Sequence, residues 1–435
     1  MSEARRSREA RRQSIEQAYD HAVAEMQPDL AVRRVLGDTE RGFSVNGSNI
    51  AVTGRLMVVA VGKAAAPMAN AAAACLRGKV DEGFVLTKDG HLGAAPEAFA
   101  TFEAAHPVPD QRGIDATRVI LQAVESLSRD DVVLALISGG GSALLESPRA
   151  GLALADIQQV TDLLLRAGAP IQHLNAVRSE LSEVKGGGLR RAIGQARVVS
   201  LILSDVLGND PEVIASGPTI VRQTNPERAI RLLNDYALTD RVPAKVSAYL
   251  SAAASNPDTA ANPDARNDVF EIIGDNAQFV AAVGSYLEGQ GLLVGHVWSD
   301  REGEARDQAM EWVNAAWRSD TDAVIGGGEL TVTVRGDGVG GRNTEFVLAA
   351  VSHLASSGRA ITVASLASDG QDGGADAAGA SVDESSEAAL RDQAVDIGAS
   401  LGANDSATAL ESIGALVSPG PTGTNVNDVY IAVRG

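Results

Sequence analysis

Two cationic residues stand at places from which a parallel sheet would present them to an anion. Lys63 follows the apolar run Leu56–Val61, which predicts a buried strand, and precedes an alanine-rich stretch that predicts a helix. Arg342 follows a pair of glycines and precedes Asn343 at another predicted helix start. Such a lysine can bind phosphate as a point charge, and such an arginine can stabilise charge on a transferring phosphoryl group. The alternatives are a lysine that extends to solvent at a domain edge and an arginine in a helix-end ion pair.

A glycine-rich loop, 138–142, follows the short apolar run Val132–Ile137, which predicts a strand buried on both faces of a parallel sheet. Glycine lets another group approach the backbone closely, and Ser142 is predicted to cap a helix that begins at Ala143. Free N–H groups and the positive end of a helix dipole would then face an anion such as phosphate. The alternative is a tight strand-to-helix turn without a ligand.

Further candidates for phosphate or nucleotide binding lie in other polar, glycine-rich stretches. Several of these stretches follow predicted strands, and in open α/β sheets ligands bind beyond the carboxyl ends of the strands. The full set of candidates is Ser138, Gly139, Gly140, Gly141, Ser142, Lys185, Gly186, Gly327, Gly328 and Asn343.

Carboxylates in the same kind of loop are candidates for binding a metal ion or the substrate. Asp205 and Asp210 flank a glycine turn after an apolar strand, and Mg²⁺ usually takes one or two carboxylates together with substrate phosphates. Capping of the turn by these aspartates is the alternative. Glu329, Asp369 and Asn425 complete the set, and spacing alone does not say which of these groups meet.

Two common nucleotide-binding patterns and two histidines are further possible signals of function. The P-loop pattern fails, because Met57 stands where its first glycine would be and Ala64 where its Ser or Thr would be. The dinucleotide pattern G-x-G-x-x-G does occur at 336–341, after a predicted strand at 330–334 and before a helix, which is a partial match to a nicotinamide site. His106 and His173 are acid–base candidates whose alternative role is structural, and no general base is assigned.

The elements that must position these residues alternate between strand and helix in both halves of the chain. Such alternation predicts an α/β fold with two domains built on mainly parallel sheets, and 435 residues are too many for one ordinary core. We expect an N-terminal Rossmann-like domain at 1–255 and a C-terminal domain at 256–435, joined near the polar stretch 252–266. The candidate loops are shared between the two, which suggests an active site in a cleft with one domain on each side.

Composition narrows the class of partner and the compartment. Aromatic residues make up only 3% of the chain, so the predicted cores consist of Ala, Val, Leu and Ile. The net charge of −19 argues against a nucleic-acid partner. No apolar run reaches the roughly 18 residues that a membrane span needs. The single cysteine, Cys75, fits a reducing cytoplasm, and the acidic, lysine-poor sequence suggests adaptation to salt.

Taken together, the motifs resemble the glycerate 2-kinases that carry a MOFRL C-terminal region. The resemblance runs from about residue 15 to the C-terminus, and several motifs in fixed order are more specific than any one of them. The matching stretches are Val61-Gly62-Lys63-Ala64, His106-Pro107-Val108-Pro109-Asp110, Ile137–Leu145, Asn175-Ala176-Val177-Arg178, Val184–Gly188, Ser204–Asp210, Ala215–Thr219, Gly327-Gly328-Glu329, Gly340–Glu345, Ser368–Gly373 and Pro421–Asp428.

The resemblance implies an enzyme of two α/β domains that transfers the γ-phosphoryl group of ATP to the 2-hydroxyl of D-glycerate with Mg²⁺. It implies that Lys63 and Arg342 are the catalytic residues, and a homodimer is a candidate assembly. One alternative is an NAD(P)H-dependent hydroxypyruvate reductase, which rests on the pattern at 336–341 and on Asp369. Another is a non-catalytic protein that binds a sugar acid or a nucleotide.

Overall fold

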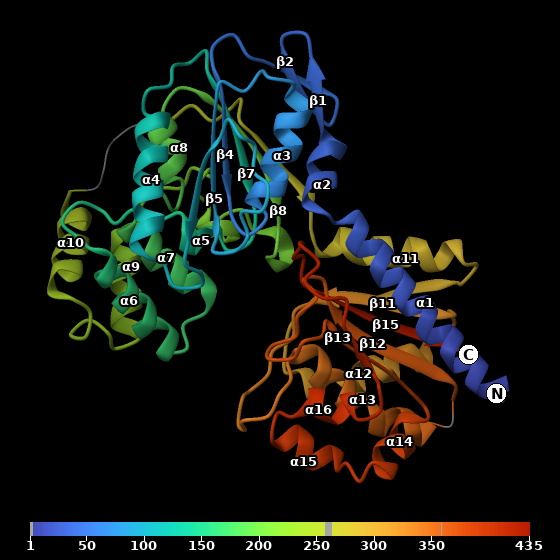
Figure 1. Cartoon of the computed structure of the whole chain (residues 1–435). Helices are drawn as coiled ribbons and strands as arrows, with labels where there is room; N and C mark the ends of the chain where they lie inside the picture. Colours follow the sequence, from blue (N-terminus) through green and yellow to red (C-terminus); the bar gives the residue numbers. More distant parts are fainter. Residues whose placement is uncertain (1–2, 257–262, 358) are drawn as a thin grey trace. The chain divides into compact units, whose positions relative to one another are not determined.

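The computed structural model describes residues 3–256, 263–357 and 359–435, and the chain forms two compact units. One unit comprises residues 28–273, and the other comprises residues 1–27 together with 274–435 (Figure 1). The expected division at 255/256 differs from this one, because residues 269–274 form the last strand of the first unit's sheet and because the first helix packs on the second unit. Part of the predicted linker, 257–262, lies outside the described residues.

The unit 28–273 is built on a six-stranded sheet in the order β6-β5-β4-β7-β8-β9. The registers of β6 to β8 are all parallel, as the sequence predicts. Every residue of β4 and β7 is buried, because helices cover both faces of the sheet. The strands are β4 (Leu56–Val61), β5 (Glu82–Lys88), β6 (Ala100–Ala104), β7 (Val132–Ile137), β8 (Arg197–Leu203) and β9 (Val269–Gly274).

The chain leaves β4 toward β5 on one side and later returns to β7 on the other side of β4. Helix α3 packs on one face of the sheet, whereas α4 and α8 contribute to the core on the opposite face (Figure 1). The strand order therefore reverses between β4 and β7, and such a switch point is where α/β sheets bind ligands. These helices are α3 (Ala65–Leu76), α4 (Gln111–Val124) and α8 (Gly188–Ile193).

Two further parts complete this unit. A small antiparallel sheet of β1 (Leu36–Thr39), β2 (Gly42–Val45) and β3 (Ser48–Ala51) follows α2 (Pro28–Val35) and was not predicted from the sequence. Four helices bury an apolar cluster of their own, separate from the sheet core. They are α6 (Leu154–Arg166), α7 (Ile171–Leu181), α9 (Pro226–Asp235) and α10 (Ala244–Ser255).

The second unit also has a six-stranded sheet, in the order β10-β11-β15-β12-β13-β14, but its strands are mostly antiparallel. Only the β10–β11 pair is parallel among the five neighbouring pairs, which corrects the prediction of a mainly parallel sheet. The reason is that the last strand, β15, inserts between β11 and β12, and strand direction there cannot be read from an apolar pattern. The strands are β10 (Val294–Arg301), β11 (Ala323–Gly328), β12 (Ile361–Ala367), β13 (Gly379–Asp383), β14 (Leu416–Val417) and β15 (Asp428–Arg434).

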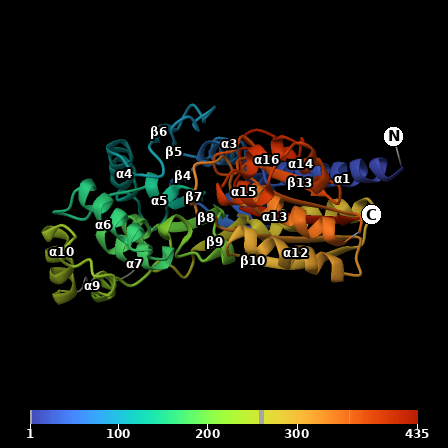
Figure 2. The ribbon, with the colours of Figure 1, turned by 90° about the horizontal axis from the view of Figure 1, so that it is seen from below.

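Helices cover both faces of this second sheet. Helices α12 (Ala305–Arg318) and α13 (Arg342–Ser357) lie side by side on one face (Figure 2). Four of the few aromatic side chains, Trp298, Trp312, Phe346 and Tyr430, meet there, so this core is not purely aliphatic. The expected strand at 330–334 is absent; within this stretch Thr331 makes a single bridge to Glu304. Three short helices, α14 (Ser386–Asp392), α15 (Ile397–Gly402) and α16 (Ser406–Glu411), follow β13.

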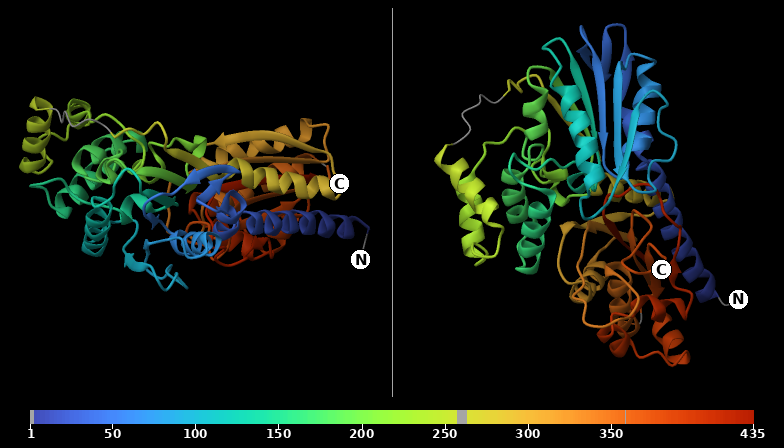
Figure 3. Two further views of the ribbon diagram at one scale, coloured as in Figure 1. Left: turned by 90° about the horizontal axis from the view of Figure 1, so that it is seen from above. Right: turned by 60° about the vertical axis from the view of Figure 1, so that its left-hand side comes forward.

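The first helix, α1 (Glu3–Glu25), belongs to this second unit and runs alongside α11 (Asn276–Gly289), as the left view of Figure 3 shows. Its inner face is fully buried, and the Tyr19 hydroxyl donates to the carbonyl of Ala367 at 2.9 Å. The Arg11 guanidinium donates to Thr362 and to Glu384. No helix in the described part of the chain is long and apolar enough to cross a membrane.

The packing of α1 predicts that Tyr19→Ala destabilises the second unit. Truncation of a buried aromatic side chain costs about 3 to 5 kcal/mol in unfolding free energy. All three tryptophans, Trp298, Trp312 and Trp317, lie in this unit, so urea unfolding followed by tryptophan fluorescence reports on it. Gln13→Ala, at an exposed position of the same helix, is the control and should leave the midpoint unchanged. An unchanged midpoint in Tyr19→Ala would contradict the assignment of α1 to this unit.

Candidate active site

The switch point of the first sheet brings the loop after β4 against the loop after β7. The Lys63 amide donates to the carbonyl of Gly139 at 2.9 Å, and the Ala64 amide donates to the Ser138 hydroxyl at 3.0 Å. A Cβ on Gly62 would overlap Ser138, so only glycine allows this approach. The sequence correctly anticipates that the Lys63 loop and the glycine loop follow strands, and the fold makes those strands neighbours.

The Lys63 side chain is half-buried, and its ammonium makes no hydrogen bond or ion pair with any residue in the described ranges. Its neighbours are Gly140 and His106, since a Cβ placed on Gly140 would lie 3.2 Å from Lys63 Cγ and 3.3 Å from His106 Nε2. A partly buried cation without a counter-ion is available to an anionic ligand. Lys63 therefore stays the leading candidate in this unit for binding a phosphate group.

The rest of the glycine loop differs in part from its predicted form. Ser142 does not cap a helix; it lies inside the one-turn helix α5 (Gly141–Leu144), which begins after Gly140, and its hydroxyl pairs with that of Ser216 at 2.7 Å. The Ser138 hydroxyl is already bound to the Ala64 amide, and Gly139 packs against the Asp205 carboxylate. Both hydroxyls of the loop thus have partners within the protein, and its contacts help to place Lys63.

Lys185, predicted to bind phosphate, is instead committed to a buried ion pair. Its ammonium lies 2.7 Å from Glu146 Oε2 and 3.0 Å from the carbonyl of Leu145, and both charged side chains are at most 1% exposed. Burial lowers the pKa of Lys185 to about 8, although the Glu146 carboxylate opposes this shift. The neighbouring Gly186 donates its amide to the carbonyl of Ser216. Both residues therefore hold the segment after α7 in place.

The two aspartates of the loop after β8 have different environments. Asp210 accepts a hydrogen bond from the Glu212 amide at 2.9 Å, so it caps a turn, as the alternative interpretation proposes. Asp205 instead turns its carboxylate toward Gly139 in the neighbouring loop. No group of three or more His, Cys, Asp or Glu side chains in the described ranges is arranged as a metal site. Of this pair, Asp205 is the one that lies beside the loop carrying Lys63.

In the second unit, Arg342 is held by a buried carboxylate. Its guanidinium makes two hydrogen bonds to Asp428, with Nε to Oδ2 at 2.5 Å and Nη2 to Oδ1 at 2.8 Å, and Asp428 is fully buried at the start of β15. Burial raises the pKa of Asp428 to about 6 against the opposing charge of Arg342. Burial lowers the pKa of Arg342, the charge of Asp428 raises it, and the net shift is upward. Both groups are therefore charged at neutral pH.

Glu329 completes a polar cluster around Arg342. One of its carboxylate oxygens lies 3.5 Å from Arg342 Nη2, and the other accepts from the side-chain amide of Asn427 at 2.8 Å. Glu329 follows β11, Asn427 precedes the antiparallel β15, and Asp428 is the first residue of β15, so the two strand ends meet at the same sheet edge. Asn427 and Asp428 were part of a motif but were not named as site residues, because their meeting with Arg342 depends on the position of β15.

The start of α13 is capped by the protein itself. Asp372 is fully buried and accepts hydrogen bonds from the amides of Asn343 and Thr344 at 2.9 and 2.8 Å. A carboxylate at this helix N-terminus takes the place that a phosphate would occupy. Asn343 itself is buried and bonds Asp372 and Ser365. Neither Asn343 nor the helix start is therefore open to nucleotide phosphates.

Other predicted site residues of this unit have structural partners. Gly327 and Gly328 lie inside β11 and are buried, and the Asn276 side chain fills the space beside Gly327. Asp369 and Asn425 each accept a backbone amide two residues further along, at 3.0 and 3.3 Å, and so cap turns. The dinucleotide pattern at 336–341 is not preceded by a strand, and α13 behind it is already capped. The geometry that a nicotinamide site requires is therefore missing in the described structure.

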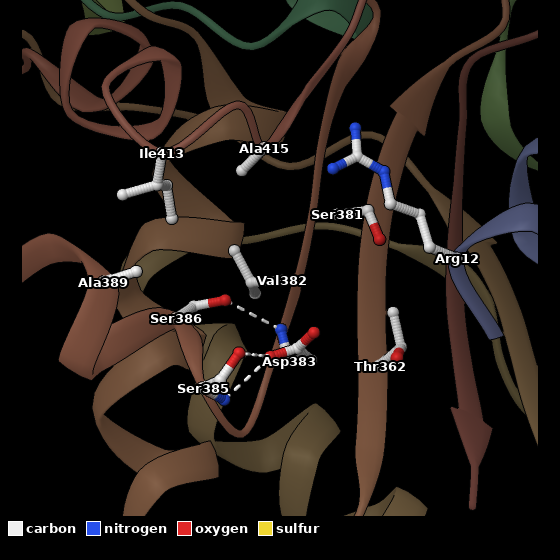
Figure 4. A pocket seen from close by; sticks show the side chains of 10 residues that line it. All are labelled: Arg12, Thr362, Ser381, Val382, Asp383, Ser385, Ser386, Ala389, Ile413 and Ala415. Carbon is white, nitrogen blue, oxygen red and sulfur yellow. Dashed lines mark hydrogen bonds between the residues drawn. The ribbon is translucent and has the colours of Figure 1, made fainter. Parts of the chain in front are cut away.

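A small cavity of about 130 Å³ lies elsewhere in the second unit (Figure 4). It is lined by Arg12 of α1, by Ser381 and Asp383 of β13, and by side chains of α14 and its surroundings. In Figure 4 the Asp383 carboxylate is bonded to Ser385, and the Arg12 guanidinium points away from it. No predicted site residue lines this cavity, so it is separate from the Arg342 cluster.

Comparison with known proteins places these features in a family. Residues 14–251 match the family model described as a domain of unknown function, DUF4147, and residues 322–428 match the MOFRL family. The chain is thus a two-unit α/β protein of the MOFRL type.

The relatives make the family more specific. A D-glycerate 2-kinase of Thermotoga maritima is 38% identical over 87% of this chain and 90% of its own length. A glycerate 2-kinase of Pyrococcus horikoshii is 34% identical over 95% of this chain and 94% of its own. The crystal structure of a Thermotoga maritima glycerate kinase superposes with a TM-score of 0.87 at 35% identity and covers 98% of this chain and 100% of that one. This chain belongs to the glycerate kinase family.

The hydroxypyruvate reductase name also occurs in this family. It is carried by an Agrobacterium vitis protein that is 38% identical over 98% of this chain and 94% of its own length. The same level of similarity therefore links this chain to proteins of two names. The geometry of the site distinguishes between the kinase and the reductase activity.

The buried Lys185–Glu146 pair predicts a loss of stability and no loss of ATP affinity in Lys185→Met. Removal of one partner leaves a buried charge unpaired, which costs about 3 to 5 kcal/mol. Lys79→Met, which breaks an exposed pair with Asp38, should cost about 1 kcal/mol or less. The double variant Lys185→Met/Glu146→Leu should regain much of the loss. Urea unfolding measures the stability of each variant, and calorimetry measures its ATP affinity. Unchanged stability together with lost ATP affinity would contradict this prediction and support phosphate binding by Lys185.

Proposed function

We propose that this chain transfers the γ-phosphoryl group of ATP to the 2-hydroxyl of D-glycerate, giving 2-phosphoglycerate and ADP. The observation that carries the proposal is the unpaired ammonium of Lys63 at the sheet's switch point, in a chain whose relatives are named glycerate kinases. A strong anion such as a triphosphate is the ligand that such a position favours. The relatives are named as kinases, and this also supports ATP as the phosphoryl donor.

Phosphoryl transfer depends mainly on positioning and on neutralising the charge of the transferred group. Lys63 supplies a point charge at the switch point, and Arg342 supplies a planar guanidinium whose orientation is fixed by two hydrogen bonds to Asp428. Asp428 is itself fully buried, so it cannot turn away to solvent, and Arg342 remains oriented. Each cation acts on the reaction to the extent that its attraction is stronger in the transition state than in the ground state.

Mg²⁺ is part of the proposal, and the donor set fits it. Mg²⁺ usually keeps several waters and binds one or two carboxylates together with nucleotide phosphates, so a protein cage of three ligands is not needed. Asp205, beside the glycine loop, would be the carboxylate that holds it, and Glu329, beside Arg342, is the alternative. The ion would neutralise charge on the phosphates when bound.

The reductase alternative has less support. The pattern at 336–341 lacks its strand, and Asp372 occupies the helix N-terminus that a cofactor pyrophosphate would need. A non-catalytic binding protein would not require the oriented Arg342.

A cytoplasmic location is supported by the single cysteine, Cys75, whose thiol pKa is raised by burial. The homodimer and the adaptation to salt stay predictions from the sequence.

Lys63→Ala and Arg342→Ala should each lower turnover with D-glycerate and ATP by about 10³-fold, the range known for electrostatic donors and arginine fingers. ATP affinity should fall much less, because the lost attraction belongs mainly to the transition state. Lys245→Ala and Arg231→Ala, which remove exposed cationic side chains, are the matched controls and should keep normal turnover. Near-normal turnover in Lys63→Ala would remove this residue from the catalytic site.

Asp205→Asn should raise the Mg²⁺ concentration needed for half-maximal turnover, since it removes one carboxylate charge from the proposed ion. Asp210→Asn makes the same chemical change in the same loop and keeps a turn-capping side chain, so its Mg²⁺ dependence should equal that of the wild type. Turnover measured across a Mg²⁺ titration for the wild type and the two variants tests this prediction. A normal Mg²⁺ requirement in Asp205→Asn would leave Glu329 as the remaining carboxylate.

A further inference from the structure

His106 and Lys63 meet over the backbone of Gly140. His106 follows β6, and a Cβ placed on Gly140 would lie 3.1 Å from His106 Cδ2, 3.3 Å from its Nε2 and 3.2 Å from Lys63 Cγ. Gly140 has a φ of +83°, so a side chain there would be strained as well as crowded. The imidazole edge therefore lies beside the lysine that we propose as the phosphate-binding cation.

The surroundings of His106 are cationic. Burial, followed by the charges of Lys63, Lys88 and His91, lowers the pKa of His106 to about 4. The Glu103 carboxylate acts on His91 and accepts a hydrogen bond from the Gly90 amide at 2.8 Å. The imidazole of His106 is therefore neutral at physiological pH and can accept a proton.

His106 differs in this respect from the other histidine that the sequence offers as an acid–base group. His173 Nδ1 lies 2.8 Å from the Tyr236 hydroxyl, and the two rings pack edge to face between α7 and the end of α9. Within the described ranges, neither ring nitrogen of His106 makes a hydrogen bond with another residue. His173 is thus structural, whereas the ring nitrogens of His106 remain available for hydrogen bonding to a ligand.

We propose that His106 is the general base of the phosphoryl transfer, accepting the proton of the substrate hydroxyl at its Nε2. This inference rests on the proposed function. The 2-hydroxyl oxygen of D-glycerate bonds to the γ-phosphorus while the bond from that phosphorus to the β–γ bridging oxygen breaks. The electron pair of the broken bond leaves with ADP, and the hydroxyl proton moves to Nε2 of His106.

The neighbouring cations explain why this base would act only with its substrates bound. Lys63, Lys88 and His91 disfavour a further positive charge on the ring in the free protein. The triphosphate and the substrate carboxylate bring several negative charges, which offset that repulsion and make protonation of His106 easier. Binding of ATP is therefore expected to raise the pKa of His106, which couples the proton transfer to an occupied site.

The kinetic test compares His106→Ala and His106→Gln with His173→Gln as the matched control. Loss of a general base lowers turnover by about 10²-fold or more, and KM for both substrates should change less than about threefold. Glutamine can donate and accept hydrogen bonds but cannot take the proton, so it should not restore turnover. Added imidazole should partly restore turnover in His106→Ala but not in Lys63→Ala. Normal turnover in His106→Gln would overturn the inference.

A titration followed by NMR tests the same inference without reference to activity. In the free wild-type protein, the His106 ring resonances should be those of the neutral ring from pH 8 down to about pH 5.5, whereas an ordinary histidine titrates near 6.5. In Lys63→Met, and with a non-hydrolysable ATP analogue bound to the wild type, the midpoint should move upward into this range. A His106 midpoint near 6.5 that neither change affects would contradict the inference.

The two proposals fail in distinguishable ways. A wild-type protein without glycerate kinase activity would refute the proposed function, whatever the state of His106. An active wild type with fully active His106 variants would refute only the role of His106. Thermal unfolding of each variant, followed by circular dichroism, ensures that a loss of turnover is not a loss of fold.

Discussion

The close approach of two backbone loops at the ends of β4 and β7 is the constraint on which the candidate site depends. Hydrogen bonds run from Ser138 N to the Val61 carbonyl and from Lys63 N to the Gly139 carbonyl, both at 2.9 Å. They fix the point at which Lys63 leaves the sheet, and they leave no room for a side chain on Gly62. Because the strand order reverses at this point, the lysine emerges where α/β sheets bind ligands.

The burial and the ion-pair partners of each cationic side chain distinguish structural residues from candidate functional residues. Lys185 is completely buried and has Glu146 beside it, as the cost of an unpaired charge requires. Arg342 has a buried partner that orients it and a more exposed one, Glu329, at longer range. Lys63 has no partner in the described ranges, so an anion from outside the chain would supply its counter-charge.

In the second unit, two buried carboxylates decide which polar groups can bind a ligand. Asp372 caps α13 from a loop that lies 28 and 29 residues further along the chain, and Asp428 reaches Arg342 across 86 residues. The capped helix cannot hold a cofactor phosphate, and the oriented arginine suits phosphoryl transfer. This arrangement favours the kinase over the reductase, although a relative carries the reductase name.

The sequence by itself determined the α/β class, most strands and helices, and the placement of Lys63 and Arg342 at element ends, because apolar periodicity and glycine positions act locally. It did not determine the antiparallel insertion of β15, the docking of α1 on the second unit, or the partners of Lys185, Asn343 and Gly327. Those depend on residues far apart in the chain, and only the tertiary structure decides which charges are paired and which remain open to a ligand.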